Sequence, residues 1–163
     1  MLNHVVGFLC VALISGKPSF AQSSHESTRT NVRYPQLRKE LLEMEVNDQH
    51  FGNLFMHTLS QHPNDTASVN AAGKKMNSIY NRNTAALKKI LHRYGWPGIS
   101  LVGRKGAEAA FLIVQHSNDT LFQRACLPLL DNAYERGQVP GDAVALLTDR
   151  VLVREGKPQM YGT

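Results

Sequence analysis

The most apolar stretch downstream of the N-terminus, residues 107–114, stops abruptly on the polar residues Gln115 and His116. Ala109–Val114 is apolar on every side of a helix, and such a helix is usually buried all round. The turn-forming residues 95–98, GWPG, precede it. The chain therefore predicts a central helix over about residues 105–117, sunk in the core, with a polar cluster at its C-terminal end.

The N-terminus has the layout of a secretory signal peptide. An apolar run of 12 residues, 5–16, is followed by Lys17-Pro18 and by small residues around a cleavage point near Ala21. A membrane anchor would need about 20 apolar residues. We therefore predict a signal peptide at 1–21, a secreted or periplasmic protein, and no integral membrane anchor after cleavage.

The rest of the chain is long enough for one domain with a real core. The Ser/Thr-rich residues 22–33 predict a flexible tether, and 34–163 a single helical domain. Loss of 1–21 removes Lys17 and leaves 17 basic and 13 acidic residues, a net charge of +4. It also leaves Cys126 as the only cysteine, so an exported domain would have no internal disulfide, and its core must hold it together.

Two long helices are predicted before the central one. The first runs from about Tyr34 to Pro63 and the second from about 67 to 94, and each carries an apolar stripe at spacings of three, four and seven. The first stripe contains Leu37, Leu41, Met44, Phe51, Phe55 and Leu59. Each stripe also includes one polar residue, Asp48 in the first and Asn83 in the second.

The C-terminal part predicts a fourth helix from about 119 to 137, which Pro128 should kink, and a short helix at 143–148. Arg150–Arg154 has an apolar β-branched centre, and the turn at 155–157 separates it from Gln159–Thr163, so 150–163 is interpreted as a β-hairpin. The predicted fold class is mainly α: a compact helical domain of about five helices with a small C-terminal β-hairpin.

Several short motifs support a resemblance. They are Trp96-Pro97, residues 113–116 (IVQH), residues 147–150 (LTDR) and residues 159–163 (QMYGT), in that order. With them the chain, from about Leu37 to Thr163, resembles the bacterial domain of unknown function family 6624. The likeness also takes in Asp48 and Asn83, which are the polar residues that the helical periodicity singles out. It implies no reaction, substrate or cofactor.

Polar side chains on core stripes need partners, because burying an unpaired carboxylate or amide is costly. Asp48 is either a general base or substrate clamp, or a structural group bonded to backbone or to Arg150. Asn83 either orients a ligand or bonds backbone such as the Arg124 carbonyl that Pro128 frees. We weight the structural alternatives more heavily in both cases.

His116 is the strongest catalytic candidate, since a histidine held by a carboxylate is a common general base. Asp119 is three residues away, but it is also a natural N-cap for the fourth helix. The alternative, and the commoner case, is a core histidine that bonds only to backbone. Asp149-Arg150 is interpreted as an internal ion pair, with an anion clamp as the alternative.

Two functions remain open. The first is an exported module that binds a small ligand or a cell-envelope component, or whose polar cluster simply fixes the packing. The second is a hydrolase-like enzyme in which His116 is the general base, Asp48 or Asp149 orients it, and Arg150 steadies developing negative charge. The candidate catalytic residues are His116, Asp48 and Asp149, and the candidate ligand-binding residues are Asn83, Gln115, Asp119, Arg150, Gln159, Tyr161 and Trp96.

Other classes of site lack support in the sequence. His50, His57 and His62 do not have compact ligand spacing and no HExxH is present, so no metal is predicted. No glycine-rich phosphate loop or GxSxG elbow occurs, and no cofactor is predicted. The basic outer side of the second helix is interpreted as a solvated face, with no nucleic-acid partner.

Overall fold

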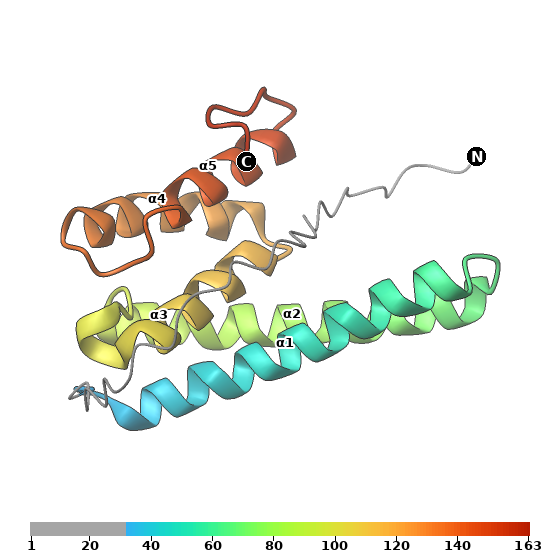
Figure 1. Cartoon of the computed structure of the whole chain (residues 1–163), viewed down its shortest axis with the longest axis horizontal. Helices are drawn as coiled ribbons and strands as arrows, with labels where there is room; N and C mark the ends of the chain where they lie inside the picture. The colour runs from blue at the N-terminus through green and yellow to red at the C-terminus, as the bar shows by residue number, and fades with distance from the viewer. Residues whose placement is uncertain (1–31) are drawn as a thin grey trace, which may run out of the picture.

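The structure, a computed structural model, describes residues 32–163 and contains five helices (Figure 1). The predicted signal peptide and all of the predicted tether except Val32 and Arg33 lie outside the described residues. The helices are α1 (Pro35–Gln61), α2 (Thr66–Tyr94), α3 (Ile99–His116), α4 (Thr120–Glu135) and α5 (Ala143–Arg154). The mainly α class and the number of helices are confirmed.

Helices α1 and α2 form a long antiparallel hairpin. Pro35 occupies the first turn of α1, where a missing N–H is harmless. The Asp65 side chain caps α2 by accepting a hydrogen bond from the Ser68 amide at 3.0 Å. Gly95, with φ of 70°, ends α2 in a conformation that favours glycine. These signals are local, which is why both helices are predictable from the sequence.

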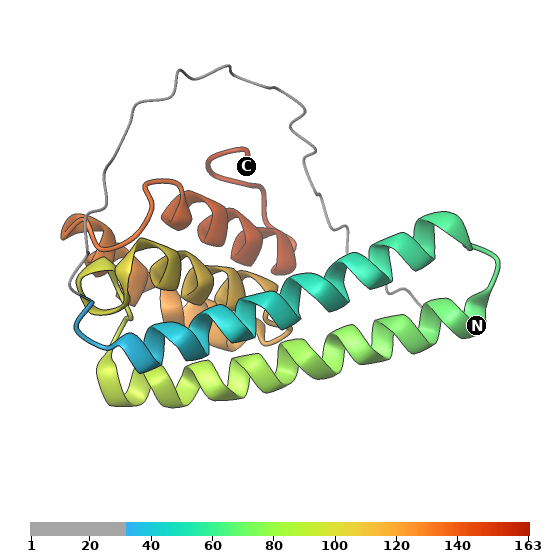
Figure 2. The same ribbon diagram turned by 60° about the horizontal axis from the view of Figure 1, so that its bottom comes forward.

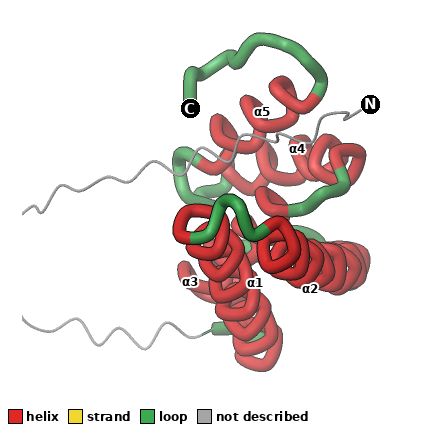
Figure 3. The backbone as a smooth tube through the Cα atoms, turned by 90° about the vertical axis from the view of Figure 1, so that its right-hand side faces the viewer, coloured by secondary structure: helices red, strands yellow, loops and turns green. Residues whose placement is uncertain are grey.

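Helix α3 lies against both helices of this hairpin, and α4 and α5 pack together as a second layer on its other side (Figures 2 and 3). The apolar run is largely buried, with Ala109, Ala110, Ile113 and Val114 at most 1% exposed and Leu112 partly exposed. Leu41 of α1 and Leu87 of α2 are fully buried in the same core. Burial of each such large side chain stabilises the fold by about 1.5–3 kcal/mol.

The hairpin extends beyond the other three helices as an arm, residues 49–78 (Figure 1). The last buried residue of α1 is Asp48, the first buried residue of α2 is Ile79, and none of residues 49–78 is buried. Leu59, which the apolar stripe places in line with the core, is 38% exposed. Along the arm the apolar residues of each helix pack only against the other helix and are therefore only partly buried.

The start of α3 differs from the prediction, which placed it at about residue 105. The helix begins at Ile99 and is interrupted at Gly103, where φ is 71° and ψ is 166°. A Cβ at this position would meet the Arg38 Nη1 atom and a Val32 methyl group at 3.3 Å. The residue therefore has to be small as well as tolerant of positive φ.

The predicted C-terminal hairpin is wrong. Residues 150–154 continue α5, and no strand occurs anywhere in the described residues. Val151 is 3% exposed, four residues after the fully buried Leu147, so packing of a helical face overrides the β propensity of the valines. After Glu155 the chain forms a loop, which a side chain rather than a partner strand holds in place. Within residues 32–163, no helix has the length and apolar character needed to cross a membrane.

Candidate functional site

Asp48 of α1 and His116 at the end of α3 are in direct contact. His116 Nδ1 lies 2.5 Å from Asp48 Oδ1, a close hydrogen-bonding contact. The Asp48 side chain is 1% exposed and that of His116 18% exposed. The buried carboxylate thus occupies Nδ1, and Nε2 is the ring nitrogen left for water or a ligand. The other carboxylate oxygen, Oδ2, is buried without a hydrogen-bond donor.

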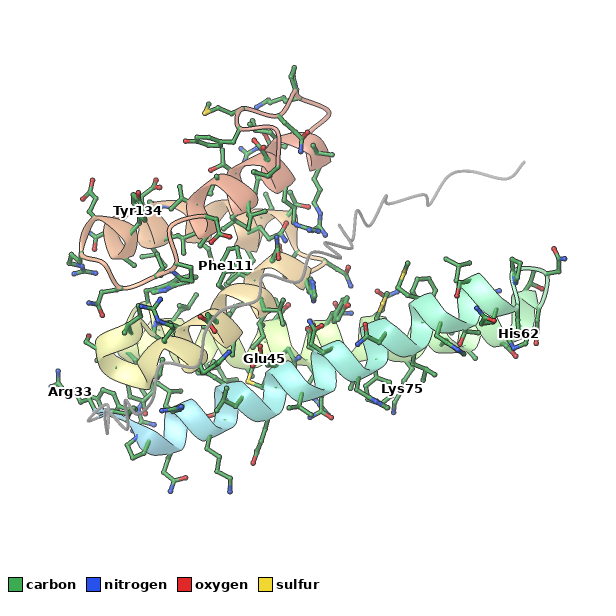
Figure 4. All side chains as sticks on the ribbon, in the orientation of Figure 1. Arg33, Glu45, His62, Lys75, Phe111 and Tyr134 are labelled. Carbon is green, nitrogen blue, oxygen red and sulfur yellow. The ribbon has the colours of Figure 1, made fainter. Side chains whose placement is uncertain are left out.

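Asn83 joins the same region from α2. Its Nδ2 donates to the backbone carbonyl of Met44 at 3.2 Å, and the residue is 1% exposed. Met44 precedes Asp48 by one helical turn, so Asn83 bonds α1 directly and not the Arg124 carbonyl suggested by the sequence. The structure therefore brings Asp48, Asn83 and His116 together from three helices. Figure 4 shows the side chains between these helices.

Tyr80 covers one face of the histidine, and the sequence did not single it out. The two ring centroids are 5.3 Å apart at an interplanar angle of 33°. Burial, together with the negative charge of Asp48, raises the pKa of Tyr80 to about 12, although Arg150 lowers it slightly. The phenol is therefore neutral at ordinary pH and can donate a proton in a hydrogen bond but cannot act as a base.

The Tyr80 hydroxyl also lies very close to the α1 backbone. A Cβ built on Gly52 would be 2.8 Å from this oxygen, nearer than real Cβ atoms approach. Gly52 follows Asp48 by one turn, so the missing side chain leaves room for the phenol beside the carboxylate. The signal was visible in the sequence only as a glycine inside a helix, which is unfavourable without a packing reason.

A hydrogen-bond network fixes the turn that follows His116. Ser117 accepts from the Thr84 hydroxyl at 2.9 Å through Oγ and from Arg154 at 2.7 Å through its carbonyl. Gln123 accepts from Arg154 at 2.9 Å and donates to the carbonyls of Val114 and Gln115. Gln123 is fully buried. It bonds the end of α3, and the network holds His116 in position.

Asp119 caps α4 and does not contact His116. Its carboxylate accepts from the Phe122 amide at 2.9 Å and pairs with Lys88 at 2.7 Å. The hydrogen bond from Lys88, followed by that from the Phe122 amide, lowers the pKa of Asp119. The N-cap alternative stated from the sequence is thus the one the structure shows.

Asp149 holds the C-terminal loop and forms no ion pair with Arg150. Its two oxygens accept from the amides of Met160, Tyr161 and Thr163 at 2.7–2.9 Å and from the Thr163 hydroxyl at 3.0 Å. Burial raises the pKa of Asp149, but these hydrogen bonds outweigh burial and lower it to about 2. With both oxygens engaged by the loop, Asp149 is not placed to orient His116.

Arg150 is left without the ion pair predicted for it. In the part of the chain that the structure describes, no hydrogen bond or ion pair involves its guanidinium, and its Nε is buried without an acceptor. Burial, and the charge of Arg154, lower the pKa of Arg150. A half-buried cation with free donors is unusual, since such groups are normally paired.

The remaining candidates are dispersed. Gln115 is half-buried beside His116, and Gln159 and Tyr161 are exposed on the C-terminal loop, where Gln159 Nε2 donates to the Thr163 carbonyl at 2.6 Å. Trp96 is buried at the opposite end of α3 from His116 and lines a separate open pocket of about 470 Å³. It therefore does not belong to the same site.

The arrangement suits proton transfer. A histidine whose Nδ1 is held by a carboxylate has a fixed tautomer and a free Nε2, which can accept a proton from water and return it. No Ser, Thr or Cys within residues 32–163 is hydrogen-bonded to His116, and burial raises the pKa of the Cys126 thiol to about 12. The described residues contain no group of three His, Cys, Asp or Glu side chains that could hold a metal ion.

Comparison with known proteins gives one match. The sequence model of a family described as "Family of unknown function (DUF6624)" matches residues 35–163. That range contains every helix and all the residues of the site. No curated protein and no solved structure matches the chain.

Proposed function

Because the chain belongs to family DUF6624, whose function is unknown, its chemistry has to be inferred from its own residues, and we propose that it is a hydrolase-like enzyme in which His116 is the general base. The observation that carries the proposal is the 2.5 Å contact between His116 Nδ1 and the buried Asp48 carboxylate. In this role Asp48 is a positioning residue, since it acts only through the imidazole.

The proposed step uses water as the nucleophile. Nε2 of His116 takes a proton from water while the water oxygen attacks an ester or phosphoester centre, and the protonated imidazole then gives that proton to the leaving oxygen. Tyr80 limits the rotation of the imidazole ring from one side, and the network around Ser117 fixes the end of α3. No covalent intermediate is needed.

The first test measures hydrolysis by the purified chain of a panel of p-nitrophenyl esters and phosphoesters. His116→Gln should lower kcat by about 10²–10⁴, the usual contribution of a general base. Lys89→Gln, an exposed residue on the outer side of α2, is the matched control and should leave kcat unchanged. Equal rates for His116→Gln and the parent chain would remove His116 from the mechanism.

The role of Asp48 needs a different measurement. Asp48→Asn should lower kcat and also change the imidazole tautomer, because an amide nitrogen can donate to Nδ1 where the carboxylate accepts from it. The ¹⁵N chemical shifts of the two ring nitrogens report the tautomer directly. If the shifts are the same in Asp48→Asn and the parent chain, Asp48 does not orient the ring.

A second candidate function is a small-ligand binding or interaction module whose polar cluster only fixes the packing. It is favoured by the closure of Asp48 and Asn83, each 1% exposed. In that case His116→Gln should reduce the free energy of unfolding by about 1–3 kcal/mol through the unpaired Asp48 carboxylate. A thermal melt of His116→Gln that matches the parent, together with lost hydrolysis, would favour the enzyme over the module.

We also propose that the protein is exported to the periplasm or the medium, where a cell-envelope compound is the expected ligand or substrate. The support is the apolar run at 5–16 and the small residues before position 22. Expression of the full chain in a bacterial host should yield a periplasmic product whose N-terminus, read by mass spectrometry, lies near Gln22. A cytoplasmic product that retains Met1 would contradict export.

A further inference from the structure

Arg150 has donors that nothing in its surroundings uses. Its Nε is buried without an acceptor, and no hydrogen bond or ion pair involves the guanidinium among the residues that the structure covers, 32–163. The carboxylate next to it in sequence, Asp149, is fully engaged by the C-terminal loop. A guanidinium in this setting is stabilised only by water or by a bound acceptor, and an anion satisfies it best.

Two observations place Arg150 in the neighbourhood of the histidine. Arg154, one turn later on the same face of α5, donates to the carbonyl of Ser117, the residue that follows His116. Tyr80, which stacks on His116, is near enough to Arg150 for the guanidinium to lower the phenol pKa against the stronger effect of burial. Arg150 therefore lies in the region of Tyr80 and the end of α3, where His116 is found.

The local charge balance favours an anion. Arg150 and Arg154 lie one turn apart, and neither forms an ion pair with a carboxylate within residues 32–163. The one buried carboxylate of the cluster, Asp48, is engaged by His116. Asp149, the other buried carboxylate nearby, is held by the C-terminal loop, so neither arginine has a carboxylate partner in the described part of the chain and an added anion would be attracted to them.

We propose that Arg150 binds an oxyanion, a carboxylate or a phosphate, of a small molecule at this site. The two terminal nitrogens of the planar guanidinium, which are not among its buried atoms, can offer two parallel N–H donors, a geometry that fits either group. If His116 is the general base proposed above, the substrates of the enzyme are small anionic molecules. This assignment of a substrate class rests on the proposed function. The anion site itself rests on Arg150 alone.

The test is a titration of the full chain with inorganic phosphate and, separately, with acetate at constant ionic strength, followed by NMR. The resonance of the Arg150 Nε–H group, assigned by its loss in Arg150→Lys, should shift and saturate. Arg150→Gln should weaken binding by about tenfold or more, since it removes the charge and the paired donors. Arg150→Lys keeps the charge without the planar fork and should lie between the two.

Two controls separate the site from general charge and from catalysis. Lys89→Gln also removes one positive charge from an exposed position and should bind as the parent chain does. His116→Gln should retain anion binding while hydrolysis is lost. No saturable shift in the parent chain, or equal binding by Arg150→Gln, would overturn the proposal. Anion binding by a parent chain that hydrolyses none of the esters or phosphoesters would contradict the proposed function and leave the anion site intact.

Discussion

At the residue scale, Tyr80 connects the polar groups of the site. Its ring packs against that of His116, and its hydroxyl lies close to the α1 backbone at Gly52. Burial and the charge of Asp48 raise the pKa of its phenol, and the charge of Arg150 lowers it. Because burial raises the pKa of the phenol to about 12, it keeps its proton through the pH range in which histidine titrates. The effect of the Tyr80 phenol on the site is therefore steric and dipolar, and it does not change with pH within that range.

This packing predicts a coupling between Gly52 and Tyr80. Gly52→Ala alone should reduce the free energy of unfolding by about 1–3 kcal/mol, because the new methyl group would lie 2.8 Å from the hydroxyl oxygen. In a Tyr80→Phe background the oxygen is gone and the nearest ring carbon is 4.0 Å away. There the same change should stabilise the helix by roughly 0.5–1 kcal/mol, the propensity gain of alanine over glycine.

Urea unfolding of the four chains of this double-mutant cycle provides the measurement. A coupling free energy near zero would show that the phenol moves aside without cost, and that Gly52 is not required for the position of Tyr80. Gly141→Ala is a suitable reference, since a Cβ there would have only an ordinary contact with Tyr134 at 4.0 Å.

At the element scale, the sequence predicts where helices form, but it predicts poorly which segments pack against one another. The stripes, caps and terminating glycine of α1 and α2 are local features, and the all-round apolar run of α3 requires burial whatever surrounds it. The error at 150–163 arises because Val151 and Val153 favour strands only when a partner strand is present. Here Val151 belongs to the buried face of α5, and the Asp149 carboxylate accepts hydrogen bonds from backbone amides of the following loop.

The same limit applies to the site. Asp48, Asn83 and His116 stand out because each is polar at a position where the helical period demands an apolar residue. Tyr80, Thr84 and Ser117 do not, since an aromatic or a hydroxyl side chain on a core face is ordinary. Arg150 was assigned to Asp149 on proximity in sequence, and adjacent residues of a helix point in different directions.

The C-terminal loop predicts a response to acid. The folded-state pKa of Asp149 is about 2, below its ordinary value of 3.8. The carboxylate therefore stabilises the loop at any pH above about 4, and this stabilisation is lost as the pH falls from about 4 through 2. Hydrogen exchange at the amides of Met160, Tyr161 and Thr163 should lose protection in that window, after correction for the intrinsic rate.

Asp149→Asn provides the complementary measurement near neutral pH. An amide oxygen can accept only part of the four hydrogen bonds, so the same three amides should exchange faster in Asp149→Asn than in the parent chain at pH 6. Unchanged protection in both experiments would show that the loop is held by contacts other than the Asp149 carboxylate.

At the scale of the whole molecule, the hairpin is divided into a buried half and an arm. The buried residues Leu37, Leu41, Met44 and Asp48 of α1 fall in the body, while residues 49–78 have none. Gly73 lets the two helices of the arm approach closely, since a Cβ there would be 3.3 Å from the Phe55 ring. The arm is thus stabilised by the contact of two helices only.

This division predicts a gradient of local stability along both helices. Backbone amides in 49–78 should exchange with solvent faster than those in 37–48 and 79–94, because opening the arm exposes little apolar surface. Hydrogen–deuterium exchange with mass spectrometry of peptic fragments measures it. Equal protection along the full length of α1 would mean that the arm is covered by another molecule or is far more stable than its packing indicates.

The division has a mechanical consequence. Asp48 is the last buried residue of α1, and the helix continues from it for about 20 Å to Gln61, at 1.5 Å per residue. If a partner bound the tip of the arm and tilted α1, the Asp48 carboxylate would move relative to the His116 imidazole. A contact of 2.5 Å between these groups tolerates little displacement. A force applied at the tip of the arm would thus disturb the contact between Asp48 and His116 from a distance.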